Sequence, residues 1–74
     1  MESSEITRRR TDLGLSQADL ARELGVDRAT VHRWEAGISR PRGAALTGLT
    51  ATLARLERNE ANRVRRARRQ PPDR

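Results

Sequence analysis

Residues 15–37 read LSQADLARELGVDRATVHRWEAG, and this stretch decides the fold. Ser16 stands three residues before Asp19, in the spacing of a capping box in which Asp replaces the usual Glu or Gln. An apolar stripe at helical spacing follows: Leu20, Ala21 and Leu24. Gly25 occupies the position where many helices end in a left-handed residue. We therefore expect a short helix between Ser16 and Gly25.

A second helix is indicated directly afterwards, over residues 28–36. Asp27 can cap it, and Gly37 closes it as Gly25 closes the first. Val31 and Trp34, three residues apart, share its inward face. Two short helices joined by a tight turn with a central glycine have the build of a helix-turn-helix.

Helical signals continue on both sides of this unit, and no segment alternates apolar and polar residues as a strand does. Residues 3–13 predict a first helix, with Ser3 or Ser4 as its cap and Gly14 as its end. After a loop over residues 38–43, leucines recur at positions 46, 49, 53 and 56. We predict an all-α fold with an extended C-terminal helix.

The end of that last helix is less sharply marked. The apolar pattern fades beyond Leu56, although Pro71 is the first residue after Gly48 that would break a helix. We expect helix to about Asn62 and then a flexible Arg-rich tail. The predicted organisation is a helix-turn-helix domain over residues 1–62 and a tail over residues 63–74.

The charge distribution points to a polyanionic partner. The 74 residues carry a net charge of +6, and every basic residue is Arg, which reflects either a GC-rich genome or selection for bidentate contacts. Residues 1–60 hold ten arginines against nine acidic residues, whereas residues 61–74 hold six arginines against Asp73. The body is thus nearly neutral, and any nucleic acid it binds must be contacted by individually placed side chains.

Composition also excludes several classes of protein. The chain has no Cys, which excludes disulfides and thiolate metal sites, and its single His leaves no cluster that could hold a metal. No apolar run is long enough for a membrane span, so we expect a cytoplasmic protein without a membrane partner. Without a Gly-rich phosphate loop or paired carboxylates, an enzyme is not expected, and neither is a cofactor.

Ten positions in and around the opening stretch match one family pattern. They are Gly14, Ser16, Gln17, Leu20, Ala21, Gly25, Val26, Trp34, Glu35 and Gly37. The stretch resembles the helix-turn-helix of the lambda-repressor/Cro-like (Cro/C1-type) transcription regulators of phages and bacteria, and the resemblance covers roughly residues 5–56. The compact size also resembles phage autorepressors such as anti-CRISPR-associated regulators. The resemblance implies four helices, or five where a further helix builds the dimer interface.

The resemblance further implies how the chain would bind double-stranded DNA, with residues 28–36 in the major groove. Base contacts are expected from Arg28, Ala29, His32 and Arg33. Backbone contacts are expected from Ser16, Gln17, Thr30, Ser39, Arg40 and Arg42. Alternatives stay open: Arg28 could offset Asp27, Arg33 could bind only phosphate, His32 could be a solvated surface residue, and Ser16 and Gln17 could be caps.

Other residues are expected to support the site. Trp34 is expected in the core, and Arg10 and Glu35 resemble a partly buried ion pair of the family. Leu46 and Leu49 should pack on Val31 and Trp34. Leu53 and Leu56 should then face a partner chain in a homodimer, unless all four leucines are core.

The sequence thus predicts a homodimeric repressor that binds a palindromic operator. Two alternatives remain. The first is an antitoxin or other regulator of a two-gene module, which binds a protein partner through its C-terminal tail. The second is RNA binding through the Arg-rich segment that begins at Arg63.

Overall fold

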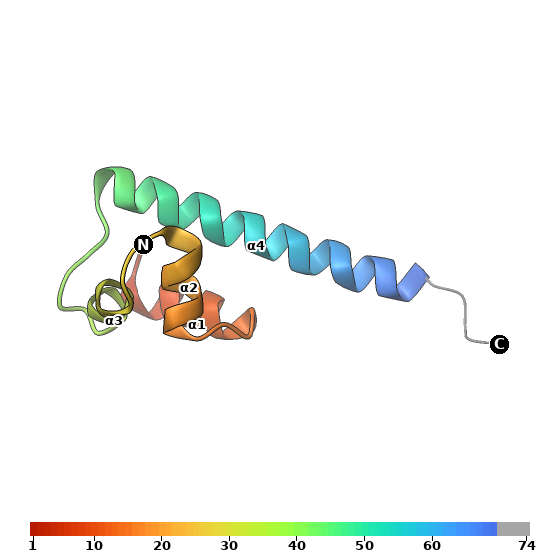
Figure 1. Ribbon diagram of the computed structural model, residues 1–74, viewed down its shortest axis with the longest axis horizontal. Helices are drawn as coiled ribbons and strands as arrows, with labels where there is room; N and C mark the ends of the chain where they lie inside the picture. The colour runs from red at the N-terminus through yellow and green to blue at the C-terminus, as the bar shows by residue number, and fades with distance from the viewer. Residues whose placement is uncertain (70–74) are drawn as a thin grey trace.

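The computed structural model describes residues 1–69, which form four helices and no strand (Figure 1). The helices are α1 (Ser3–Asp12), α2 (Gln17–Leu24), α3 (Arg28–Glu35) and α4 (Gly43–Arg69). The all-α prediction is confirmed. None of the described helices is long and apolar enough to cross a membrane.

The turn chemistry of the helix-turn-helix is confirmed as predicted. The Ser16 hydroxyl accepts the Asp19 N–H, and the Asp19 carboxylate accepts the Ser16 N–H, both at 3.0 Å. Gly25 ends α2 with a φ of 75°, in the left-handed region that glycine enters without a steric penalty. The Asp27 carboxylate caps α3 by accepting the Thr30 N–H at 2.9 Å. These contacts fix the angle between α2 and α3 locally.

The predicted cap of α1 is wrong. Ser3 and Ser4 lie inside the first turn, and Glu2 is the N-cap without a side-chain capping bond. The Glu2 carbonyl accepts the N–H groups of Glu5 and Ile6, both at 3.1 Å, which starts the helix one residue before either serine could cap it. This helix begins through backbone bonds and the burial of Ile6.

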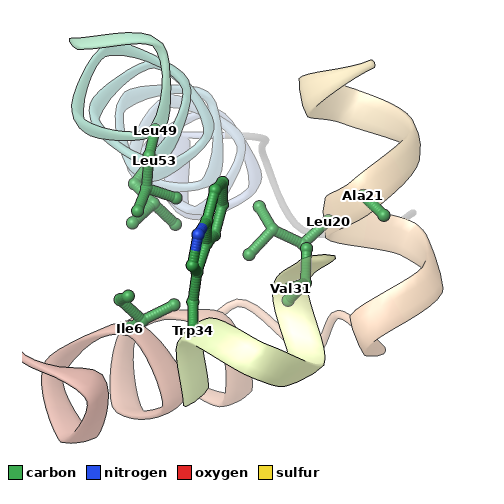
Figure 2. Packing of buried hydrophobic residues seen from close by; sticks show 7 residues of the cluster. All are labelled: Ile6, Leu20, Ala21, Val31, Trp34, Leu49 and Leu53. Atoms are coloured by element: carbon green, nitrogen blue, oxygen red, sulfur yellow. The ribbon is translucent and has the colours of Figure 1, made fainter. Parts of the chain in front are cut away.

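The core draws on all four helices (Figure 2). Its buried members are Ile6, Leu20, Ala21, Val31, Trp34, Leu49 and Leu53. The Trp34 indole stands between Ile6, Leu20 and the two α4 leucines, so one side chain from α3 meets the other three helices. A buried aromatic in that position holds α3 to the rest of the domain.

Two predictions about the α4 leucines are wrong. Leu53 was expected to face a partner chain, but it is 0% exposed within the monomer. Leu46, expected in the core, is only half-buried. The reason is that α4 packs on the bundle through its N-terminal half, so Leu49 and Leu53 lie against Trp34. Leu56 is half-buried against the same core.

α4 is also longer than predicted. It continues to Arg69, past the end expected near Asn62, and projects beyond the other helices (Figure 1). Arg and Ala dominate residues 63–69 and favour helix without tertiary contacts. Arg63 adds an ion pair with Glu60, with Nη2 and Oε2 2.7 Å apart. The part of the tail after Arg69 lies outside the described residues.

Candidate nucleic-acid interface

α3 has one buried face and one exposed face. Val31 and Trp34 are buried in the core. The side chains predicted to contact bases all lie on the exposed remainder: Arg28, Ala29, His32 and Arg33. Because the two groups alternate at helical spacing, the packing of the core directs these four side chains into solvent.

The arginines of α3 and the following loop take no part in the ion pairs of the described residues. Arg8, Arg9, Arg10, Arg22 and Arg55 each pair with a carboxylate on α1, α2, α3 or α4. Among residues 1–69, by contrast, no carboxylate lies within ion-pair distance of the four arginines on α3 and the loop after it: Arg28, Arg33, Arg40 and Arg42. A body with a net charge near zero therefore presents unpaired positive charge along α3 and its following loop.

Thr30, which is predicted to contact phosphate, uses its hydroxyl within the cap of α3. Its hydroxyl donates to Asp27 Oδ1 at 2.6 Å and accepts from Arg33 Nη2 at 3.3 Å, so its only proton is occupied within the helix cap. The hydrogen bonds from the Thr30 hydroxyl and N–H lower the pKa of the Asp27 carboxyl. Thr30 thus braces the first turn of α3.

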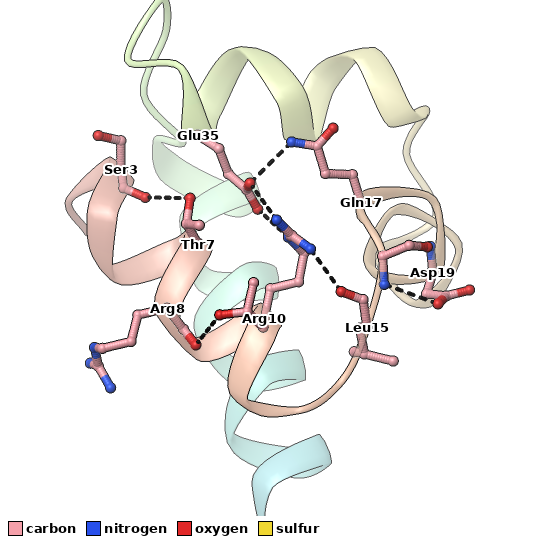
Figure 3. Close-up of polar contacts among 10 residues, drawn as sticks. Ser3, Thr7, Arg8, Arg10, Leu15, Gln17, Asp19 and Glu35 are labelled. Carbon is pink, nitrogen blue, oxygen red and sulfur yellow. Dashed lines mark hydrogen bonds and ion pairs between the residues drawn. The ribbon is translucent and has the colours of Figure 1, made fainter.

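The start of α2 lies beside the end of α3, and its two predicted contacts behave differently. Ser16 is exposed, and because its oxygen accepts the Asp19 N–H, its own proton remains available to a phosphate. The Gln17 side chain instead donates to Glu35 Oε1 at 3.0 Å (Figure 3). For Gln17, the backbone N–H at the helix N-terminus is the group that could meet a phosphate.

Arg10 and Glu35 form the ion pair expected from the family resemblance (Figure 3). Arg10 Nε and Nη2 donate to the two Glu35 oxygens at 2.6 and 3.0 Å, and Nη1 donates to the Leu15 carbonyl at 2.7 Å. The two side chains are only 13% and 6% exposed. This network joins α1, the loop after it, α2 and the end of α3, and so fixes the last turn of α3.

The fold should lose stability in acid through Glu35. Burial alone raises the pKa of this carboxyl, but hydrogen bonds from Arg10 and Gln17 and the Arg10 charge outweigh burial and hold the pKa below 4.5. Below about pH 4.5, Glu35 binds a proton more readily in the unfolded chain than in the folded protein. Its contribution to the free energy of unfolding is therefore complete above about pH 4.5. This contribution is lost as the pH falls through the lower pKa of the folded state. Urea unfolding at decreasing pH should show this decline, and Glu35→Gln should flatten it. An equally steep decline in Glu35→Gln would assign the effect to other carboxylates.

The loop between α3 and α4 is held at its start by the end of α3. Gly37 turns the chain with a φ of 76°, and the N–H groups of Ile38 and Ser39 both donate to the Arg33 carbonyl, at 3.0 and 3.3 Å. Pro41 is buried, whereas the predicted backbone contacts of the loop, Ser39, Arg40 and Arg42, are exposed. The loop is thus fixed to the end of α3.

Two contacts were missed by reasoning from the sequence. Arg9 Nε and Nη2 donate to Glu57 at 2.7 and 2.6 Å, which ties α1 to α4. Hydrogen bonding from Arg9 is the main reason that the pKa of the Glu57 carboxyl is lowered. Arg55 and Glu23 join α4 to α2 at 3.1 Å. No local pattern signals pairs so far apart in sequence.

The rest of the described surface offers little for other chemistry. Residues 1–69 hold no group of three or more side chains that could bind a metal ion. One shallow hollow of about 190 Å³ lies between the end of α1 and α4, lined by Leu13, Leu15, Leu56, Asn59, Glu60 and Arg63.

Fold and surface together define a helix-turn-helix protein, in which α2 and α3 form the motif and α3 presents an exposed basic face. The helix-turn-helix model HTH_3, of Cro/C1 type, matches residues 6–53, and the chain belongs to this family. The family consists of DNA-binding regulatory domains, not enzymes, so the protein is a DNA-binding transcription regulator. Searches of curated proteins and of solved structures found no match.

Proposed function

We propose that the protein is a homodimeric repressor that inserts α3 into the major groove of a palindromic operator. The observation that carries the proposal is the distribution of ion pairs described above. The arginines on α3 and the following loop are exposed and have no carboxylate partner among the described residues. Exposed arginines without a carboxylate partner can bind phosphates and the edges of guanine bases.

The exposed face of α3 supplies the base contacts in this proposal. Arg28 and Arg33 can each donate two hydrogen bonds to guanine O6 and N7, and the Ala29 methyl can meet a thymine methyl. His32 lies on the same exposed face. The network around Glu35 supports this role because it fixes α3 before DNA arrives.

Backbone contacts position the domain without reading sequence. Ser16 and the Gln17 N–H supply them at the start of α2, and Ser39, Arg40 and Arg42 supply them from the loop. Both groups lie beside the end of α3: Gln17 through its bond to Glu35, and the loop through its bonds to the Arg33 carbonyl. Phosphate contacts from both would hold α3 in register in the groove.

Two-fold pairing follows from the size of the site. One short recognition helix contacts too few base pairs to define a single operator, so two copies should bind half-sites about one DNA turn apart. Because Leu53 is buried within the monomer, the contact is assigned to half-buried Leu56 and the adjacent hollow, which is lined in part by Leu13 and Leu15. A repressor acts by occupying such an operator.

Leu56→Glu should separate dimerisation from folding. Leu56 is half-buried, so a folded, helical monomer with weaker DNA binding is expected, whereas Leu53→Glu should unfold the chain by burying a charge. Sedimentation and circular dichroism of both variants measure this. A Leu56→Glu protein that still sediments as a dimer would place the interface elsewhere.

Selection of binding sites from random duplex DNA by the full chain tests the proposal as a whole. We expect an enriched palindrome whose half-site centres lie about 10–10.5 base pairs apart. Failure to enrich any sequence would contradict sequence-specific binding. A single half-site without symmetry would contradict the dimer and leave the role of α3 intact.

A further inference from the structure

The projecting part of α4 carries a second basic surface, which the contacts proposed for α3 do not use. Residues 58–66 include three exposed arginines that form no ion pair among the described residues, Arg58, Arg65 and Arg66, and the exposed amide Asn62. Arg58 and Arg65 are seven residues apart and therefore lie on one stripe, while Asn62 and Arg66 are four apart on the neighbouring stripe. We call these four side chains the distal α4 face.

The acidic residues of this region lie on the other side of the helix. Leu49, Leu53 and Leu56 mark the side of α4 that faces the core, and Glu60 follows Leu56 at helical spacing along it. Glu60 pairs with Arg63, and Glu57 pairs with Arg9 on α1. No acidic residue occurs from residue 61 to residue 69. The distal α4 face is thus positive and points away from the body.

Its place in the molecule separates it from α3. Figure 1 shows α3 near one end of the longest axis, which measures 52 Å, and the end of α4 at the other. The last turns of α4 extend past the other described helices (Figure 1). Leu13 and Leu15 lie across the hollow from Glu60 and Arg63, on the side of α4 opposite the distal α4 face. A duplex segment in contact with α3 would therefore leave the distal α4 face free.

We infer that the distal α4 face is a second DNA-binding surface, which holds a duplex segment other than the half-site bound by α3. Arginines on a free helix suit phosphates, and the major groove of B-DNA is wide enough to admit a helix. The major groove of duplex RNA is deep and narrow, which argues for DNA as the partner. The contacts are to phosphates and carry no sequence preference. The inference rests on the proposed binding of an operator through α3.

The test compares two triple variants of the full chain that remove equal charge. Arg58→Gln/Arg65→Gln/Arg66→Gln removes the distal arginines. Arg8→Gln/Arg22→Gln/Arg55→Gln removes arginines that are also exposed but lie in ion pairs. Gln preserves helix propensity, which circular dichroism checks. The first measurement is the slope of the logarithm of the binding constant K against the logarithm of the salt concentration, on a duplex that lacks the selected operator. The second measurement uses protein bound to an immobilised operator duplex and records whether it captures the duplex without the operator.

We expect the distal variant to reduce the salt slope by about 0.9 for each phosphate that it no longer neutralises, or about 2.7 in all, and to lose capture of the second duplex. The paired-arginine control should retain both. Equal behaviour of the two variants, or no capture by the wild-type protein, would overturn the inference. Capture of an RNA hairpin in preference to the duplex would overturn the choice of DNA. If the wild-type protein binds no operator at all, it is the proposed function that fails.

Discussion

Trp34→Ala should leave most of the protein unfolded at room temperature. Trp34 is 6% exposed and contacts core residues of the other three helices. Truncation of a buried Trp costs about 3–5 kcal/mol, which is close to the whole stability available to a domain of this size. Circular dichroism during thermal unfolding measures the loss.

The control for this change is Val64→Ala, which truncates an apolar residue of α4 that is 40% exposed. It should shift the midpoint of unfolding little, because surface substitutions usually change stability by less than about 0.5 kcal/mol. A Trp34→Ala protein with the midpoint of the control would mean that α3 is held mainly by the polar network.

Glu35→Ala should destabilise the fold by about 3 kcal/mol or more, because it leaves Arg10 buried without its partner. Arg10 is 13% exposed, and its guanidinium would keep only the Leu15 carbonyl. Gln17 would lose its acceptor as well. Urea unfolding measures the loss in the free energy of unfolding. DNA binding should fall by more than the folded fraction does, because the last turn of α3 and the start of α2 both lose their contacts.

The double variant Arg10→Met/Glu35→Leu distinguishes loss of the pair from loss of packing. Replacement of both charges by apolar groups should recover most of the stability lost in Glu35→Ala. A double variant as unstable as the single one would show that the hydrogen bonds themselves, including those to Leu15 and Gln17, hold the network. A Glu35→Ala protein within about 0.5 kcal/mol of wild type would contradict any structural role for the pair.

Local chemistry explains which parts of the fold could be predicted from the sequence. The Ser16–Asp19 box, the left-handed Gly25 and the Asp27 cap each depend on residues within four positions, so the pattern alone specifies them. The cap of α1 was mistaken because two adjacent serines offer the same signal. Only the backbone bonds to the Glu2 carbonyl decide the register.

Tertiary geometry explains the errors. Whether Leu53 or Leu46 enters the core depends on where α4 crosses the bundle, which the leucine spacing leaves open. The Arg9–Glu57 pair joins residues 48 positions apart, and the burial of Pro41 depends on the path of the loop after α3. α4 extends past the end of its apolar stripe because the Arg and Ala side chains beyond Asn62 favour helix on their own.

The candidate site was easier to predict than the packing that supports it. The exposed residues of α3 follow directly from the burial of Val31 and Trp34, which the spacing indicated. Which arginines would be free of carboxylates could not be read from the sequence, since Arg28 directly follows Asp27 and Arg33 closely precedes Glu35 along the chain. Only the fold shows that Asp27 is committed to its cap and Glu35 to Arg10.

The central claim is that α3 reads bases while the loop after it holds phosphates. It is tested most directly by the affinities of Arg28→Ala, Arg33→Ala and Arg40→Ala for the selected operator and for a scrambled duplex. Arg28→Ala and Arg33→Ala should each cost about 1–3 kcal/mol on the operator and little on the scrambled duplex. Arg40→Ala should weaken both duplexes equally and reduce the salt slope by about 0.9. Equal weakening of both duplexes by all three variants would contradict base recognition by α3.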